Sequence, residues 1–479
     1  LEVERTESES SHRFTTEFLD VIVDRTSLQL RVLDSEGKLL MEDLGEPLRS
    51  NGGLVVERSA GTAERFFGLG MRGRTPIDAR RQRIEAMTPL LVSSQGYGLH
   101  HVAPGDYVFE LASEQPDTYR IVIRNAARLD FYFYYGPRPK DVLEEHRKVA
   151  GAPEMPKSWQ FGVIARNQRP SGATPLPVPE EASWTTLCEA ARAMINGSMS
   201  AVLIPAFDLT PYLSSPTALF RAAALFGSVT PVTLLDHPAI LLEPDKLDAF
   251  SSMSRLRKRL QSHLVSYSVE ANTRGLPIIH PLPLQFPNDV EASRAEETFM
   301  LGDELLVAPL CSDADRRQVY LPMGVWTDLH TNATHRGRQK VSAEARGGEP
   351  PIFIKNGSIL PLNRLKTGEA MLLHYIPNLA AEYFLYEPDV GDYSQLHAGP
   401  AGDAMRLEIE SRKERLYEWV VHHVPEVREA AMGDVKLKKA GSLKELRPGA
   451  WYYDRNAGNI HVRVHAGKGA DSVVYINFF

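Results

Sequence analysis

The sequence predicts a multidomain protein in which β-domains at both ends flank a shorter α/β segment. With 479 residues, the chain is longer than one hydrophobic core usually organises. Both ends consist of short runs of alternating apolar and polar residues separated by Gly, Pro and Asp, a pattern typical of antiparallel sheets. In the middle, compact apolar runs alternate with helical stretches, which favours parallel strands joined by helices.

Composition excludes several classes of protein. Hydrophobic residues make up 43% and charged residues 24%, which is ordinary for a globular chain. The net charge is −7, and basic runs such as 255–259 are short, so we expect solvated helix faces there and no nucleic-acid partner. No apolar run approaches the roughly 20 residues of a membrane span.

Cofactor and metal signals are also missing from the sequence. The two cysteines, Cys188 and Cys311, lie far apart in the chain, so we predict neither a disulfide framework nor a thiolate metal cluster. We expect both to be buried, small hydrophobic side chains. Phosphate-loop, metal-ligand and Ser-His-Asp patterns do not occur, and we predict no cofactor and no metal.

The amino-terminal domain is predicted to span residues 1–150 and to be a β-sandwich. Runs such as 21–23, 119–123 and 131–134 alternate in the manner of half-buried strands. Residues 140–150 then form a predicted helix that leads to the next domain.

Residues 151–288 carry the α/β signal. Three strands are predicted at 159–165, 201–207 and 229–235, with the first buried on both faces. Helices are predicted at about 184–195, 216–226 and 246–273. The β pattern then returns in two further predicted domains, 289–365 and 366–479.

Several motifs stand in an order that identifies a family. They are Glu64–Gly70, Pro89–Gly98, Pro156–Gly162, Arg274–Pro281, Phe299–Pro309, Val319–Asp328, Pro351–Leu362 and Phe384–Tyr393. Together they resemble glycoside hydrolase family 31, the α-glucosidase and α-xylosidase family, over nearly the whole chain. The resemblance implies a galactose-mutarotase-like amino-terminal sandwich, a (β/α)₈ barrel and two carboxy-terminal sandwiches.

The middle of the chain departs from that family. Members place their nucleophile in an Asp-x-Asn-Glu pattern, which occurs nowhere in this sequence, and Pro179 stands where the acid Asp would align. Leu235 replaces an Arg of the family pattern. The resemblance therefore implies a truncated barrel remnant of about three strands that lacks the catalytic carboxylates.

Candidate site residues follow the ends of the predicted strands, where barrel chemistry is located. Asp208, Asp236 and His237 are weak catalytic candidates, because carboxylates on adjacent strands lie about 5 Å apart at the backbone and retaining hydrolysis needs two of them. Sugar-binding candidates are Arg166, Trp184, Asp208 and His237; Asn167, Glu180 and Glu181 have the same general location. The competing interpretation makes the Asp residues solvated or helix-capping groups, His237 a turn residue and Trp184 a core residue.

Three functions from different classes stay open. One is a non-catalytic structural or assembly component, the second a carbohydrate-binding protein with an oligosaccharide ligand, and the third an α-glycosidase with relocated carboxylates. A three-stranded remnant would leave one sheet face and its edges uncovered, so we also expect a homodimer or a partner protein over that face.

Overall fold

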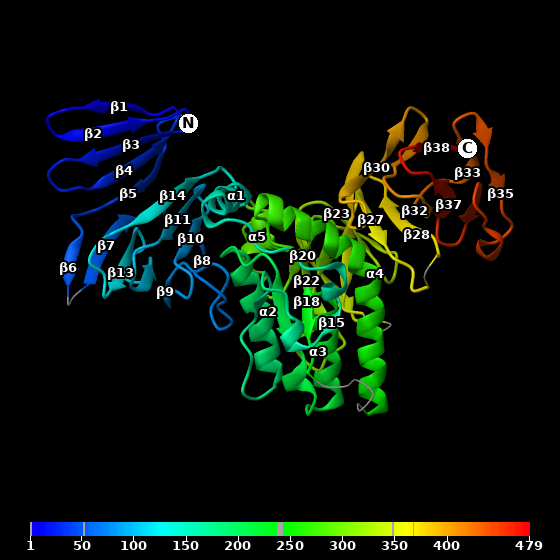
Figure 1. Ribbon diagram of the computed structural model, residues 1–479, viewed down its shortest axis with the longest axis horizontal. Helices are drawn as coiled ribbons and strands as arrows, with labels where there is room; N and C mark the ends of the chain where they lie inside the picture. The colour runs from blue at the N-terminus through cyan, green and yellow to red at the C-terminus, as the bar shows by residue number, and fades with distance from the viewer. Residues whose placement is uncertain (1, 51–52, 237–242, 347–348, 367) are drawn as a thin grey trace.

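The computed structural model describes residues 2–50, 53–236, 243–346, 349–366 and 368–479. Figure 1 shows β-sheets at both ends of the long axis, with the helices gathered between them. None of the described helices is long and apolar enough to cross a membrane.

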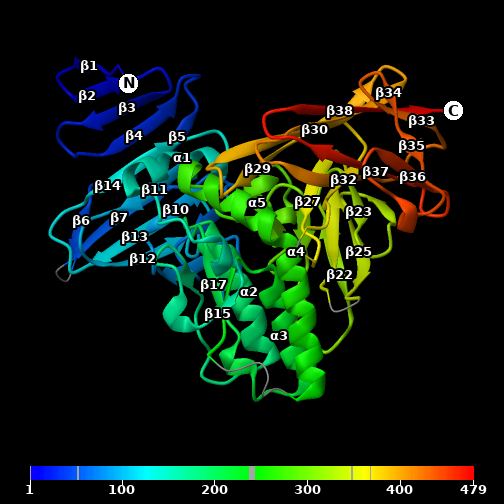
Figure 2. The ribbon, with the colours of Figure 1, turned by 45° about the vertical axis from the view of Figure 1, so that its right-hand side comes forward.

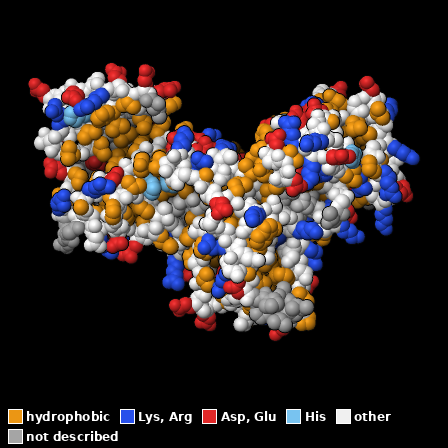
Figure 3. Space-filling view, in the orientation of Figure 1, with side chains coloured by type: hydrophobic (Ala, Val, Ile, Leu, Met, Phe, Trp, Pro, Cys, Tyr) orange, Lys and Arg blue, Asp and Glu red, His pale blue; other side chains and the backbone are white. Residues whose placement is uncertain are grey.

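The amino-terminal part contains three antiparallel sheets. A five-stranded meander comes first, made of β1 (Glu4–Glu7), β2 (Ser11–Thr15), β3 (Leu19–Asp24), β4 (Leu30–Asp34) and β5 (Leu39–Glu42). Two further sheets follow, in the orders β6 (Leu48–Ser50), β7 (Gly53–Ser59), β13 (Thr118–Arg124), β12 (Asp106–Leu111), β9 (Gln82–Glu85) and β14 (Phe131–Tyr135), β11 (Tyr97–His101), β10 (Leu90–Ser93), β8 (Phe66–Gly68). Figure 3 shows a continuous hydrophobic area over this end of the molecule.

The middle part holds a small parallel sheet with helices beside it. The sheet has the order β15 (Val163–Ile164), β18 (Val232–Leu234), β17 (Pro205–Asp208), β16 (Thr174–Pro175). The helices are α1 (Pro139–Ala150), α2 (Trp184–Ser198), α3 (Thr217–Val229) and α4 (Pro244–Arg274), with single turns at Ser158–Phe161, Arg166–Gln168 and Thr210–Tyr212. Phe207 of β17 packs edge-on against Phe226 of α3, so α3 lies on one face of the sheet.

The carboxy-terminal part contains four sheets. The first has the order β19 (Ile279–Pro281), β20 (Phe299–Leu301), β21 (Leu305–Val307), β26 (Ile352–Lys355), β23 (Val325–Asp328), β24 (Thr334–Arg336), and beside it β22 (Arg316–Leu321) pairs with β25 (Gln339–Glu344). The next has the order β27 (Ser358–Leu362), β28 (Met371–Ile376), β32 (Arg415–Val421), β37 (Asn459–Ala466), β36 (Ala450–Asp454), β35 (Lys438–Lys439). The last has the order β29 (Ala381–Glu387), β30 (Asp392–Ala401), β31 (Ala404–Glu410), β38 (Asp471–Phe478), β33 (Val427–Met432), β34 (Val435–Lys436). Short helical turns occur at α5 (Leu282–Gln285), Glu291–Arg294 and Leu443–Glu445.

The predicted strands of the middle part are longer than those observed. Residues 158–161 form a 3₁₀ turn instead of the start of a buried strand, and Trp159 is 50% exposed. The strand predicted at 201–207 begins only at Pro205. Apolar runs of this length do not distinguish a strand from a buried turn, which is why the prediction overextended both elements.

A fourth strand and a covered face correct the expectation of an open sheet. The loop after β15 contributes β16, and Thr174 N donates to Ile204 O at 2.9 Å while Leu176 N donates to Ala206 O at 2.8 Å. On the sheet face turned away from Phe207, Ala206 and Val232 are fully buried within this one chain. The premise for a covering partner, an exposed sheet face, is therefore absent from the described residues.

The two cysteines are neighbours in space, although 122 residues separate them in the sequence. Cys188 Sγ on α2 donates to the carbonyl oxygen of Cys311 at 3.4 Å. Both thiols are free and partly exposed, which corrects the expectation of fully buried side chains.

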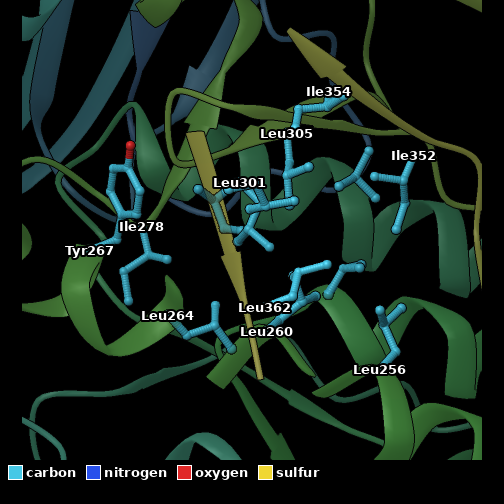
Figure 4. Close-up of a cluster of buried hydrophobic side chains, with 14 of the residues drawn as sticks. Leu256, Leu260, Leu264, Tyr267, Ile278, Leu301, Leu305, Ile352, Ile354 and Leu362 are labelled. Atoms are coloured by element: carbon cyan, nitrogen blue, oxygen red, sulfur yellow. The ribbon is translucent and has the colours of Figure 1, made fainter. Parts of the chain in front are cut away.

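Helix α4 joins the small sheet to the carboxy-terminal sheets. Figure 4 shows its apolar side chains pointing toward residues of β20, β21, β26 and β27: Leu256, Leu260 and Leu264 face Leu301, Leu305, Ile352, Ile354 and Leu362. All of these side chains are buried. A helix of 31 residues is thus held by packing along much of its length.

Arg257 corrects the prediction that the basic run 255–259 is a solvated face. Its side chain is only 2% exposed, and burial lowers its pKa to about 9, so the guanidinium remains charged at neutral pH. Nη1 donates to the carbonyls of Gly227 and Thr230, and Nη2 donates to those of Phe161 and Pro231, at 2.5 to 2.7 Å. One side chain thus satisfies carbonyls from the turn before β15, from the end of α3 and from the start of β18.

We predict that Arg257→Leu lowers the free energy of unfolding by at least about 3 kcal/mol. The substitution removes the charged donor from four backbone carbonyls, and each buried carbonyl left without a partner costs about 1–3 kcal/mol. The shift of the urea unfolding midpoint measures this. Arg255→Leu is the matched control, since the same change on an exposed position of the same helix is expected to stay within about 0.5 kcal/mol. Equal shifts for the two variants would contradict the role given to Arg257.

Candidate functional site

Four residues meet where β15, β17 and β18 end. Asp208 is the last residue of β17, Asp236 follows β18 by two positions, Arg166 follows β15 by two, and Thr210 begins the turn after β17. In a parallel sheet the carboxyl ends of the strands lie at one edge, so the short strands deliver these side chains to a single place. We call Arg166, Asp208, Thr210 and Asp236 the strand-end cluster.

Arg166 holds the two carboxylates together. Its Nε donates to Asp208 Oδ2 and lies 3.5 Å from Asp236 Oδ2, and its backbone N donates to Asp236 Oδ1 at 2.8 Å. The hydrogen bond from Arg166 to Asp208 raises the pKa of Arg166. The side chain of Asp208 is 6% exposed, whereas those of Asp236 and Arg166 are 38% and 45% exposed. The cluster is therefore closed on the Asp208 side and open to solvent on the other.

Thr210 completes the hydrogen bonding and was missed by the sequence analysis. Its backbone N donates to Asp208 Oδ1 at 2.9 Å, and its hydroxyl accepts from Asp236 N at 3.1 Å. The available signal was the Asp-Leu-Thr spacing, because an Asp side chain often accepts from the backbone two residues later. The pairing with Asp236 had no signal in the sequence.

The other predicted site residues do not belong to the strand-end cluster. Trp184 begins α2 and packs, partly buried, against the main hydrophobic core. Glu180 and Glu181 line a separate cavity of about 820 Å³, and Arg72 and Arg74 line it as well. Asn167 is exposed, and His237 lies outside the described residues.

One guanidinium and two carboxylates determine the chemistry available at the strand-end cluster. A retaining glycosidase needs one ionised carboxylate as nucleophile and one protonated carboxyl group as acid. Here both carboxylates contact the same guanidinium, Asp208 through a hydrogen bond from Arg166 Nε and Asp236 at 3.5 Å from that atom. A charged donor and two acceptors at a half-exposed edge can instead bind hydroxyl groups. Among the described residues, no group of three or more His, Cys, Asp or Glu side chains is placed to hold a metal ion.

Comparison with known proteins gives one family match. Residues 275–360 match the model of the glycosyl hydrolase family 31 C-terminal domain. Among curated proteins, the chain is 26% identical to an isomaltosyltransferase of Sporosarcina globispora over 38% of this chain and 19% of that protein. It is 32% identical to alpha-glucosidase 2 of Bacillus thermoamyloliquefaciens over 33% of this chain and 20% of that protein. The matched part is thus about a fifth of each relative.

Solved structures extend the likeness in fold to almost the whole chain. A family 31 dextranase of Flavobacterium johnsoniae, crystallised with isomaltotriose, aligns with a TM-score of 0.85 and 16% identity, covering 99% of this chain and 92% of that one. A cycloalternan-forming enzyme of Listeria monocytogenes, in complex with a pentasaccharide substrate, aligns with a TM-score of 0.84 and 14% identity, covering 99% and 72%. At these identities the likeness concerns the fold alone.

We predict that Arg166 and Asp208 are energetically coupled. Arg166→Met and Asp208→Asn should each lower the stability, and together they should lower it by about 1 kcal/mol less than the sum, because the half-exposed ion pair is partly screened by solvent. Urea unfolding of the two single variants and the double variant measures the coupling. Strict additivity would show that the contact does not contribute to stability.

Proposed function

We propose that this chain is a non-catalytic member of glycoside hydrolase family 31 and that it binds an oligosaccharide at the strand-end cluster. The family membership is proposed from the matching domain model and from the similar proteins and structures. The observation that carries the proposal is the sharing of Arg166 by Asp208 and Asp236. It leaves polar groups available to a sugar but no arrangement of nucleophile and acid.

A truncated barrel is part of the same proposal. The order β15, β18, β17 agrees with the order in which the first, eighth and seventh strands of a closed barrel are neighbours. The absence of an Asp-x-Asn-Glu pattern from the sequence supports the loss of the strands that would carry the carboxylates. The division into domains at 1–150, 151–288, 289–365 and 366–479 belongs to this proposal as well.

Oligosaccharides are the proposed ligands because of what related proteins bind. The dextranase structure contains isomaltotriose and the cycloalternan-forming enzyme contains a pentasaccharide. The half-exposed side chains of Arg166 and Asp236 offer this chain a donor and an acceptor for sugar hydroxyls. An α-glycosidase that uses Asp208 and Asp236 as relocated carboxylates is the second candidate, and a purely structural or assembly role is the third.

We predict that the chain binds isomaltotriose without cleaving it. Calorimetry should give binding in the millimolar range, about −4 kcal/mol, and Asp208→Ala should weaken it at least ten-fold, about 1.4 kcal/mol. Asp313→Ala, a change at an exposed Asp elsewhere, should leave the affinity unchanged.

Hydrolysis of an aryl α-glucoside is the companion measurement. No turnover above a buffer blank is expected. Turnover that Asp208→Asn or Asp236→Asn abolishes would replace the proposal with the relocated-carboxylate glycosidase, and binding that is equal in Asp208→Ala would move the ligand to another place.

The small parallel sheet, whose face is covered by this chain itself, leads us to predict a monomer. Ala206 and Val232 are buried within one chain, and each of the two edge strands of the described sheet, β15 and β16, has only two residues. Two backbone positions cannot build the roughly 800 Å² per partner of a stable interface. Light scattering over a dilution series should therefore give the mass of a monomer at micromolar concentration, and a stable dimer would restore the homodimer expected from the sequence.

A further inference from the structure

The only two cysteines of the sequence meet where the middle part of the chain touches the carboxy-terminal part. Cys188 lies on α2, and Cys311 lies in the loop between β21 and β22. Figure 2 shows α2 among the helices that stand between the amino-terminal sheets and the carboxy-terminal sheets. The Cys188 thiol donates to the backbone carbonyl of Cys311 at 3.4 Å. Neither cysteine belongs to the strand-end cluster.

An ion-pair bridge beside the cysteines holds their two segments together. Glu297, which precedes β20, accepts from Arg192 Nη2 at 2.6 Å and from Arg317 Nη2 at 3.4 Å. Arg192 follows Cys188 by about one helical turn, so both side chains lie on the same face of α2. Arg317 is in β22, the strand that follows the loop of the second cysteine. The bridge fixes this loop against α2, so the two cysteines meet as a fixed pair.

The surroundings make the two thiols chemically unequal. A hydrogen bond from the Cys311 side chain is the main cause that lowers the pKa of Cys188. Arg192 and Arg317 lower it further, whereas burial and Glu297 oppose them. The same hydrogen bond, followed by burial, raises the pKa of Cys311. Both side chains are partly exposed, so a small oxidant can reach them. Because the thiolate is the nucleophilic form, we expect Cys188 to react first.

We propose that Cys188 and Cys311 are a peroxide-sensitive thiol pair, whose oxidation to a disulfide fastens α2 to the loop between β21 and β22. The Cys188 thiolate attacks one oxygen of hydrogen peroxide. The S–O bond forms, the O–O bond breaks, and the departing hydroxide takes a proton from solvent to become water. The Cys311 sulfur then attacks the sulfur of the resulting sulfenic acid. The S–S bond forms, the S–O bond breaks, and the second hydroxide leaves as water with the Cys311 proton. The two thiols thus supply the two electrons that reduce the peroxide.

The first step prepares the second. In the reduced pair, the hydrogen bond to Cys188, burial and the Cys188 charge keep the proton on Cys311. Oxidation turns Cys188 into a neutral sulfenic acid, so the negative charge that raised the pKa of Cys311 is removed. The disulfide then closes a loop across 122 intervening residues, and a bond across so long a loop restricts the unfolded chain strongly. Oxidation is therefore expected to stabilise the folded protein.

The test is treatment of the full chain with hydrogen peroxide, followed by thiol counting in denaturant and by peptide mass spectrometry without reductant. Both thiols should be lost together, a peptide pair joining Cys188 to Cys311 should appear, and dithiothreitol should restore both thiols. The midpoint of urea unfolding should rise on oxidation and return on reduction. Persistence of both thiols, or a disulfide between two chains instead of within one, would overturn the proposal.

Serine variants test the order of the two steps. Cys311→Ser keeps a hydrogen-bond donor beside Cys188, and its oxidation should stop at the sulfenic acid, which dimedone traps as a mass increase. Cys188→Ser should leave Cys311 unmodified over the same time, because its thiol stays protonated. In both variants peroxide should leave the urea midpoint unchanged. Dimedone labelling of Cys311 in Cys188→Ser, or none of Cys188 in Cys311→Ser, would contradict the assigned roles and overturn the proposal.

Discussion

The middle of this protein depends on a buried guanidinium. Arg257 donates to four backbone carbonyls that belong to the turn before β15, the end of α3 and the entry to β18. A sheet whose strands have two to four residues has few ladder hydrogen bonds of its own. Arg257 of the neighbouring helix therefore supplies hydrogen bonds that longer strands would form with one another. These hydrogen bonds lie at the end of the sheet opposite the strand-end cluster.

Helix α4 uses its length for two different purposes. Its first half carries Arg257 beneath the small sheet, and its second half packs on the carboxy-terminal sheets and carries Tyr267 to Glu304. Displacing the helix would disturb both the small sheet and the carboxy-terminal sheets. The last turns of the same helix line a cavity of about 430 Å³ together with residues of β29 and β30.

The strand-end cluster shows how short parallel strands bring distant residues together. Strand ends of a parallel sheet gather side chains from distant positions, and here they bring an Arg between two Asp residues. Both carboxylates contact one guanidinium, whereas retaining glycoside hydrolysis needs one carboxylate as nucleophile and one carboxyl group as acid. The proposed binding role therefore rests on the side chain of Arg166, which follows β15.

The sequence by itself determined the β-rich ends, the helices of the middle part and the family resemblance, because periodicity and turn residues are local signals. It also placed Arg166, Asp208 and Asp236 at strand ends. Only the tertiary structure decided which of these side chains meet, that Thr210 joins them, and that residues 174–175 form a fourth strand. The burial of Arg257 and the contact of Cys188 with Cys311 were likewise not predictable. Each depends on partners between 26 and 123 residues away, and a linear pattern carries no record of such contacts.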